Sequence, residues 1–225
     1  INSSLAEFYV EHLDRIFFTT FYARAQNNNH AISEGVALYL IGYHLKRKTD
    51  RYKYDKYVKK GLTLIENSVA KLILADGTFS QYSIVYHRMV LDLLTLIEFF
   101  RQKWNLHSFS NQFYNNVKKS IVWYHEMIDP ISGDAPNIGS NDGTYLFNFD
   151  NKNYRDFRPT LNFSSIVFGM ALHQPIKENH SLVQRFNLIS SNFNKPETST
   201  SKYFKDGGFA KLVRKNGMII LRVPN

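Results

Sequence analysis

Apolar residues recur every three or four positions through most of the first 127 residues, and this period is the strongest constraint on the fold. The clearest case is the segment 54–74, where the period is kept by Tyr54, Val58, Leu62, Ile65, Val69 and Leu72. A 3.6-residue period places these side chains on one face of an α-helix. The same reasoning predicts helices over residues 4–24, 31–45, 83–103 and 110–127, and again over 161–173 and 181–190. The chain is therefore expected to be mainly α.

The segments between and after these helices have a different composition. Residues 131–159 are rich in Gly, Pro, Asn and Asp, which predicts a long irregular loop of the kind often used for binding. Residues 209–213 and 218–223, separated by a turn that contains Asn216-Gly217, predict a β-hairpin. Because a lone hairpin is only marginally stable in water, we expect a β domain that starts here and is truncated at Asn225. The expected organisation is a helical domain over 1–192, a linker over 193–202 and the start of a β domain over 203–225.

Composition and charge narrow the classes of function. The 225 residues, 44% of them hydrophobic, suffice for the core of one large domain. No run reaches the roughly 18 apolar residues of a membrane-spanning helix, so no membrane insertion is expected. The absence of cysteine excludes disulfides, thiolate nucleophiles and cysteine-bound zinc within these residues. The net charge of +9 favours an anionic partner, and the lack of a basic-aromatic module or helix-turn-helix pattern disfavours nucleic acid.

Two short stretches carry groups suited to proton transfer. Asn28, Asn29 and His30 directly precede the predicted helix over 31–45, and Tyr86 lies near the start of the helix over 83–103. An amide, an imidazole and a phenol can neutralise a sugar carboxylate and move a proton beside it without a metal or a nucleophile. Taken alone, an Asn run before a helix is more often a loop and helix N-cap, and a single tyrosine is usually a packing residue.

Several motifs in a fixed order give the chain a family resemblance. They are the segments 28–35, 75–79, 81–88, 137–143, 154–159 and 206–209. In these motifs the chain resembles the heparinase II/III-like polysaccharide lyases, which also include alginate and oligoalginate lyases. The resemblance implies an incomplete (α/α) toroid of paired antiparallel helices, followed by an antiparallel β-sandwich of which this chain holds the first hairpin. It also implies an exported bacterial protein, periplasmic or secreted, that binds its sugar chain between the two parts.

The resemblance further implies a role for each residue of the site. Asn29 and His30 neutralise the uronate carboxylate, Tyr86 is the catalytic base, acid or both, and Asn28 is expected to contact the substrate beside them. Glu34 follows His30 by four residues and shares its helical face, from which it can orient the imidazole.

Four further residues are expected to contact the substrate. His87 and Arg88 follow Tyr86 directly; at most one of them is expected to share its helical face, and either could lower its pKa. Arg155 and Arg158 flank Asp156, where a forked guanidinium suits a substrate carboxylate, but equally suits an ion pair that pins the long loop.

The expected partner is an acidic polysaccharide or oligosaccharide. No metal is assigned within the chain, because the remaining histidines show no metal-ligand spacing, and no cofactor is expected. In the resembling family a structural metal belongs to the part of the sandwich that would follow Asn225. The open strand edges of the hairpin predict self-association through residues 208–223.

Three functions are compatible with these observations. The resemblance implies a lyase that cleaves a uronate-containing glycan by β-elimination. An alternative is a non-catalytic acidic-polysaccharide-binding or capsule-biogenesis protein on the same fold. A third, a glycoside hydrolase, requires two carboxylates across a cleft, and its candidates, Asp76, Asp92, Asp134 and Asp142, show no evident pairing in the sequence.

Overall fold

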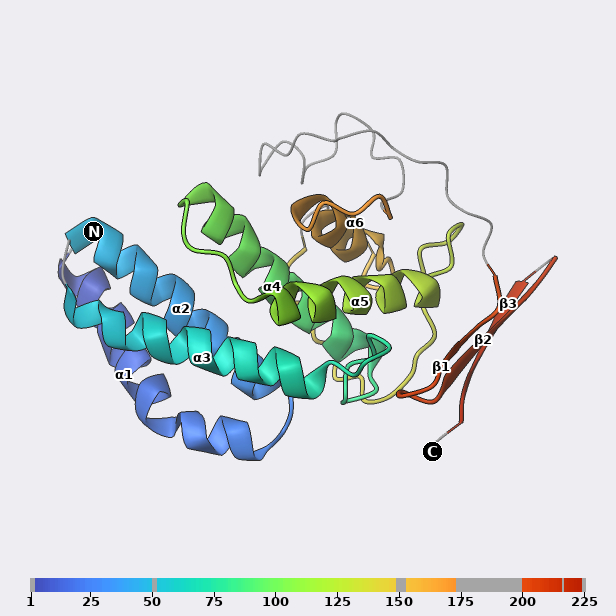
Figure 1. Ribbon diagram of the computed structural model, residues 1–225, viewed down its shortest axis with the longest axis horizontal. Coiled ribbons are helices and arrows are strands. Elements are labelled where there is room, and N and C mark those ends of the chain that lie inside the picture. Colours follow the sequence, from blue (N-terminus) through green and yellow to red (C-terminus); the bar gives the residue numbers. More distant parts are fainter. Residues whose placement is uncertain (1–2, 50–51, 149–152, 173–199, 216, 224–225) are drawn as a thin grey trace.

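The computed structural model describes residues 3–49, 52–148, 153–172, 200–215 and 217–223. These residues form a mainly helical structure with a small antiparallel sheet at one end (Figure 1). The elements in chain order are α1 (Ser3–Ala25), α2 (Asn29–Thr49), a short 3₁₀ turn (Tyr52–Tyr54), α3 (Asp55–Leu72), α4 (Ile84–Lys103), α5 (Asn111–Met127), α6 (Arg158–Val167), β1 (Lys202–Phe204), β2 (Phe209–Arg214) and β3 (Gly217–Arg222).

Most of the predicted elements are confirmed. Helices α1–α5 match the five predicted segments to within a few residues, and β2 and β3 form the predicted hairpin. Helix α6 starts earlier and ends sooner than predicted, with Pro159 in its first turn, where its missing N–H costs nothing. Strand β1 was missed, since it begins at the last residue of the predicted linker. The predicted helix over 181–190 and the linker residues 193–199 lie outside the described residues.

Helices α2 and α3 cross at close range because glycines line their contact. A Cβ atom added at Gly61 would lie 2.6 Å from the backbone nitrogen of Tyr39 and 2.7 Å from the carbonyl oxygen of Gly35. Backbone atoms cannot move aside as a flexible side chain can, so this crossing requires glycine at position 61. The crossing fixes the start of α2, which carries Asn29, relative to the rest of the bundle.

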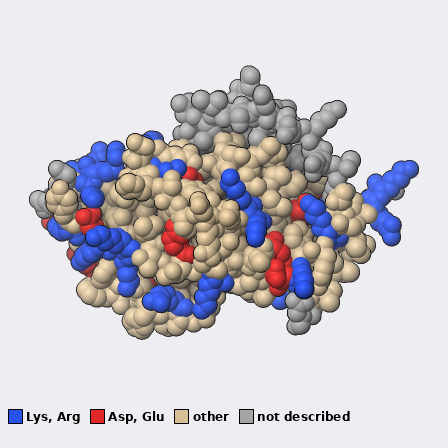
Figure 2. Space-filling model, in the orientation of Figure 1, with Lys and Arg blue, Asp and Glu red and all other residues tan. Residues whose placement is uncertain are grey.

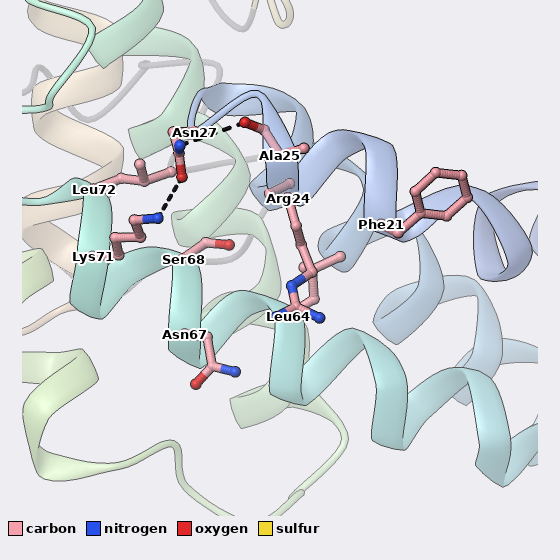
Figure 3. Close-up of a pocket in the computed structure, with 10 residues that line it drawn as sticks. Phe21, Arg24, Ala25, Asn27, Leu64, Asn67, Ser68, Lys71 and Leu72 are labelled. Carbon is pink, nitrogen blue, oxygen red and sulfur yellow. Dashed lines mark hydrogen bonds between the residues drawn. The ribbon is translucent and has the colours of Figure 1, made fainter.

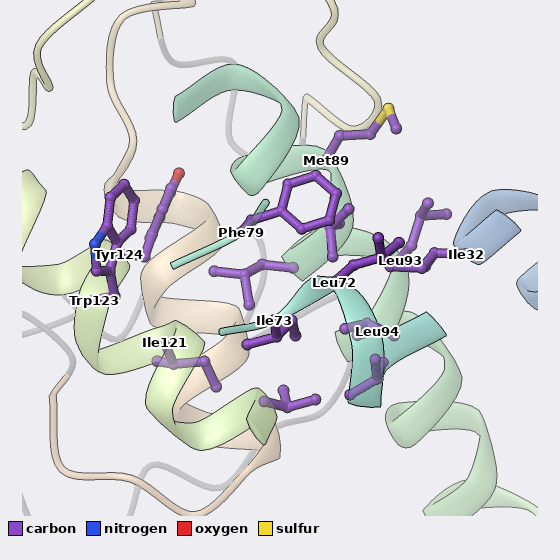
Figure 4. Packing of buried hydrophobic residues seen from close by; sticks show 14 of the residues in the cluster. Ile32, Leu72, Ile73, Phe79, Met89, Leu93, Leu94, Ile121, Trp123 and Tyr124 are labelled. Carbon is purple, nitrogen blue, oxygen red and sulfur yellow. The ribbon is translucent and has the colours of Figure 1, made fainter. Parts of the chain in front are cut away.

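Helix α4 runs through the middle of the helical part and is buried on nearly every side. Apolar residues of α4 pack against α2, α5 and α6 in one continuous core, which also includes Leu72 of α3 (Figure 4). Other members of this core are Ile32, Leu94, Ile121 and Trp123. Fully burying such side chains stabilises the fold by about 1.5–3 kcal/mol each.

His87 and Asp92 of α4 are enclosed in the interior. His87 stacks on Trp123 with 4.6 Å between ring centroids. Its Nε2 forms a hydrogen bond with the Ser120 hydroxyl at 2.7 Å. Burial lowers the pKa of His87 to about 3. Asp92 accepts a hydrogen bond from the Thr160 hydroxyl at 2.7 Å, and burial raises the pKa of Asp92 to about 7. The imidazole is therefore neutral near pH 6, where the carboxyl is largely protonated.

These two pKa shifts predict opposite pH dependences of stability. His87 takes up a proton on unfolding below its ordinary pKa of 6.5, whereas Asp92 releases one above its ordinary pKa of 3.8. Between about pH 4 and 6.5 the two contributions oppose each other, each by up to about 1.4 kcal/mol per pH unit. In Asp92→Asn, the free energy of unfolding should therefore rise more steeply with pH than in wild type. In His87→Phe, it should fall as the pH rises. Urea denaturation at several pH values tests this, and slopes equal to wild type in both variants would contradict it.

The sheet has the strand order β1-β2-β3 and packs one face on the helical part. Phe204, Phe209 and Lys211 are buried on this face. Phe209 lies against Trp123, with 5.2 Å between ring centroids, and Lys211 pairs with Glu126 of α5 at 2.7 Å. These contacts fix the sheet to the end of α5.

The opposite face of the sheet is apolar and open. It exposes Tyr203, Leu212, Ile219, Leu221 and Val223, whose side chains are 44–59% accessible. Strand β3 forms one edge of the sheet. The predicted self-association through residues 208–223 remains a prediction.

Positive charge gathers over part of the surface. On the face shown in Figure 2, Lys and Arg lie mainly over the end formed by α1–α3, with others near the sheet. Some of these cations are paired, as in the contacts of Lys46 with Asp55 at 2.7 Å and of Lys56 with Asp14 at 3.1 Å. None of the helices in the described part of the chain combines the length and apolar character needed to cross a membrane.

Candidate functional site

The first turn of α2 is held in place by the asparagines that precede it. Asn27 adopts a left-handed conformation with φ of 50°, and the side chain of Asn28 accepts a hydrogen bond from the His30 backbone N–H at 3.0 Å. Asn28 therefore caps the helix. The backbone N–H of Asn29 donates to Gln81 Oε1 at 2.9 Å, so the start of α2 is tied to the segment that leads into α4. Asn29 is buried, whereas His30 is exposed.

The first turn of α4 is built in a similar way. Ser83 is its N-cap and accepts a hydrogen bond from the Tyr86 backbone N–H at 3.2 Å. The preceding residue, Tyr82, has φ of 53°, a left-handed conformation that is uncommon for a bulky side chain. The structure thus places Asn29, His30 and Tyr86 in the first turns of two helices that Gln81 connects.

The long loop predicted over 131–159 lies across the start of α4. The Ile84 N–H donates to the carbonyl of Ile138 at 3.2 Å, and the Ser83 hydroxyl donates to the carbonyl of Ser140 at 2.6 Å. The Tyr86 hydroxyl donates to Asp142 Oδ2 at 2.8 Å. The loop therefore brings a carboxylate to the candidate catalytic tyrosine.

This carboxylate sets the protonation state of Tyr86. The hydrogen bond to Asp142 raises the pKa of Tyr86, and hydrogen bonds from Thr144 and Tyr86 lower the pKa of Asp142 to about 2. The sequence predicted the opposite direction for Tyr86, through a neighbouring cation. As the site is arranged here, Tyr86 is a neutral hydrogen-bond donor.

The two residues after Tyr86 point away from the surface, which explains this difference. The guanidinium of Arg88 is buried and donates to the carbonyls of Tyr154 at 2.7 Å and Thr144 at 2.9 Å. Its carbon Cζ lies 4.5–4.7 Å from the ring centroids of Tyr145, Tyr154 and Phe157. His87 lies in the core. Arg88 therefore anchors the loop and His87 packs the core, and neither is placed to contact a substrate.

Arg155 and Arg158 also hold the loop. Arg158 donates to both oxygens of Asp156, from Nε at 2.8 Å and from Nη2 at 2.7 Å, and Arg155 pairs with Asp134 at 2.5 Å. Of the two roles left open by the sequence, the structure shows the one in which these arginines pin the loop. Both remain partly accessible.

Glu34 lies one turn after His30 and is partly buried. Its Oε2 atom has no hydrogen-bond partner among the described residues. Burial raises the pKa of Glu34, and the positive charge of His30 acts in the opposite direction. Glu34 and His30 are therefore close enough for their charges to interact.

Two residues of the site were not singled out for it from the sequence. Gln81 accepts the hydrogen bond that links the start of α2 to the segment before α4, and Asp142 accepts the hydrogen bond from the Tyr86 hydroxyl. Gln81 belongs to the segment 81–88 that carries the resemblance, and Asp142 was considered only as a hydrolase carboxylate. The other carboxylates considered with it have structural roles: Asp92 is enclosed in the core, Asp134 pairs with Arg155, and Asp76 accepts the N–H of Gly207 at 2.8 Å.

Comparisons of the chain with protein-family models, with curated proteins and with solved structures find no match.

Proposed function

We propose that the chain is the helical part, with the first sheet of the β part, of a polysaccharide lyase that cleaves a uronate-containing glycan by β-elimination. The observation that carries the proposal is the hydrogen bond between Asn29 and Gln81, which connects the helix starts that bear Asn29, His30 and Tyr86. An amide, an imidazole and a phenol at neighbouring helix starts are the groups that the reaction requires.

The architecture supports the same proposal. Successive helices packed against one another suit an incomplete (α/α) toroid. The sheet covers the helices with one face and exposes an apolar second face, as one layer of a β-sandwich would. The proposed location is the periplasm or the cell exterior, where such glycans occur.

Neutralisation of the carboxylate is the first chemical requirement. The C5 proton of a uronate is only weakly acidic while the adjacent carboxylate carries its full charge. In the proposal, the Asn29 amide and an N–H of the His30 ring donate to the carboxylate and stabilise the enolate-like transition state. Preorganised donors of this kind are worth about 3–4 kcal/mol each.

Elimination then requires one proton to leave C5 and one to reach O4. The C5–H bond breaks, its electron pair forms the C4=C5 double bond, the C4–O4 bond breaks, and O4 takes up a proton. Tyr86 is neutral here and suited to protonate O4. To remove the C5 proton as well, it must first lose its own proton, which the bond to Asp142 opposes. In the proposal, the anionic substrate displaces Asp142, and the Tyr86 hydroxyl releases its proton to solvent. The phenolate takes the proton from C5 and, neutral again, passes it to O4.

The test is incubation of the purified chain with a panel of uronate-containing polysaccharides, monitored by the ultraviolet absorbance of unsaturated uronate. An increase with at least one substrate is expected. Binding of a polysaccharide without any increase in absorbance would contradict the proposal and favour the non-catalytic glycan-binding protein. The hydrogen bond between Tyr86 and Asp142, which keeps the hydroxyl protonated, would suit that function.

A further inference from the structure

A pocket lies directly beside the candidate site, between the end of α1, the start of α2 and the second half of α3 (Figure 3). Its volume is about 360 Å³, within the range of about 300–1,000 Å³ that is typical of small-ligand sites. Its lining includes Phe21, Arg24, Asn27, Asn67, Ser68 and Lys71.

The charged residues that line this pocket are both cations. Arg24 extends from α1 towards α3, and Lys71 lies beneath Asn27 (Figure 3). The Lys71 Nζ donates to Asn27 Oδ1 at 2.5 Å, a neutral acceptor that positions the ammonium group but leaves its charge uncompensated. Within the part of the chain that the structure describes, neither cation forms an ion pair. The pocket is therefore suited to an anion.

The remaining lining residues suit a sugar. Asn67 and Ser68 supply an amide and a hydroxyl for hydrogen bonds. Phe21, 71% exposed, places an aromatic ring at the rim. An aromatic ring together with the exposed Asn67 amide and the buried Ser68 hydroxyl matches the mixed apolar and hydroxyl faces of a pyranose.

The pocket is close to the candidate catalytic residues along the chain. Asn27 lines it, and Asn29 follows two residues later, so their Cα atoms lie within about 7 Å of each other. Ala31, two residues after Asn29 in the first turn of α2, also lines it. A glycan that extends from the start of α2 towards the end of α1 would reach the pocket.

We propose that this pocket is a subsite for a second uronate of the same glycan chain, an inference that rests on the proposed function. Arg24 binds the carboxylate with its forked guanidinium, and Lys71 contributes a point charge held in place by Asn27. The subsite selects for acidic sugars next to the one that is cleaved.

The test is titration calorimetry with a trimer of 4-linked uronic acid and with a neutral trimer of the same linkage. It is carried out in a Tyr86→Phe background, so that turnover does not interfere. Replacing both Arg24 and Lys71 by Ala should weaken binding of the acidic trimer about 10- to 100-fold, which corresponds to about 1.4–2.8 kcal/mol. Binding of the neutral trimer should not change. The matched control is Lys59→Ala with Lys118→Ala, which removes the same charge from exposed positions outside the pocket.

The outcomes separate this inference from the proposed function. Equal loss of acidic-trimer binding in the pocket variant and the control would overturn the subsite, since it would show an effect of net charge alone. Elimination by wild type together with unchanged binding in the pocket variant would overturn the subsite and leave the function standing. Loss of binding only in the pocket variant supports the subsite, even if wild type shows no elimination.

Discussion

Replacement of Tyr86 by Phe is expected to lower kcat for uronate elimination about 100- to 10,000-fold, the usual contribution of a general acid or base. The ring stays in place in this variant and only the hydroxyl is lost, so KM should change little. The matched control is Tyr82→Phe, which removes a hydroxyl four residues earlier, at a ring that packs under Arg222 at 3.8 Å. We expect this control to retain activity within a few-fold.

The Tyr86 hydroxyl also binds Asp142, so a loss of activity could in principle reflect a displaced loop. Asp142→Asn separates the two effects. It weakens the hydrogen bond and removes the negative charge that both raise the pKa of Tyr86, so the variant should remain active, with its pH profile shifted to lower pH. Full activity in Tyr86→Phe would contradict the assigned role of Tyr86.

Replacement of Arg88 by Met is expected to lower the free energy of unfolding by about 3–5 kcal/mol, because it removes a buried cation that donates two hydrogen bonds to loop carbonyls. The carbonyls of Tyr154 and Thr144 would lose their donor, and the buried Asp92 would lose the nearby positive charge that lowers its pKa. Chemical denaturation measures the change. The same substitution at the partly exposed Arg155 should cost about 1 kcal/mol or less. Equal costs at the two positions would show that Arg88 is not the main anchor of the loop.

Much of the fold was predictable because the helical period is clear over α1–α5. The hairpin was predictable from its turn residues. Strand β1 was not, since Lys202, Tyr203 and Phe204 are too few to show an alternating pattern, and their partners in β2 lie several residues further on. The start of α6 was not predictable in the same way, because proline is typical both of the end of a loop and of the first turn of a helix, where Pro159 lies.

The candidate site was predictable in part. The positions of Asn29, His30 and Tyr86 at neighbouring helix starts follow the predicted elements. The directions of His87 and Arg88 do not, because α4 is buried nearly all round and a consecutive pair on such a helix points into two different parts of the interior. The partners of Arg88 are 56 and 66 residues away in the sequence, on a loop whose path no local pattern reveals.

The measurement that tests the central claim most directly is mass spectrometry of the oligosaccharides released from an acidic polysaccharide in water enriched in oxygen-18. Elimination adds no water, so the account predicts products with a new unsaturated end and no oxygen-18. Products that are saturated and carry oxygen-18 at the new end would show hydrolysis and contradict the assignment of Asn29, His30 and Tyr86 to an elimination.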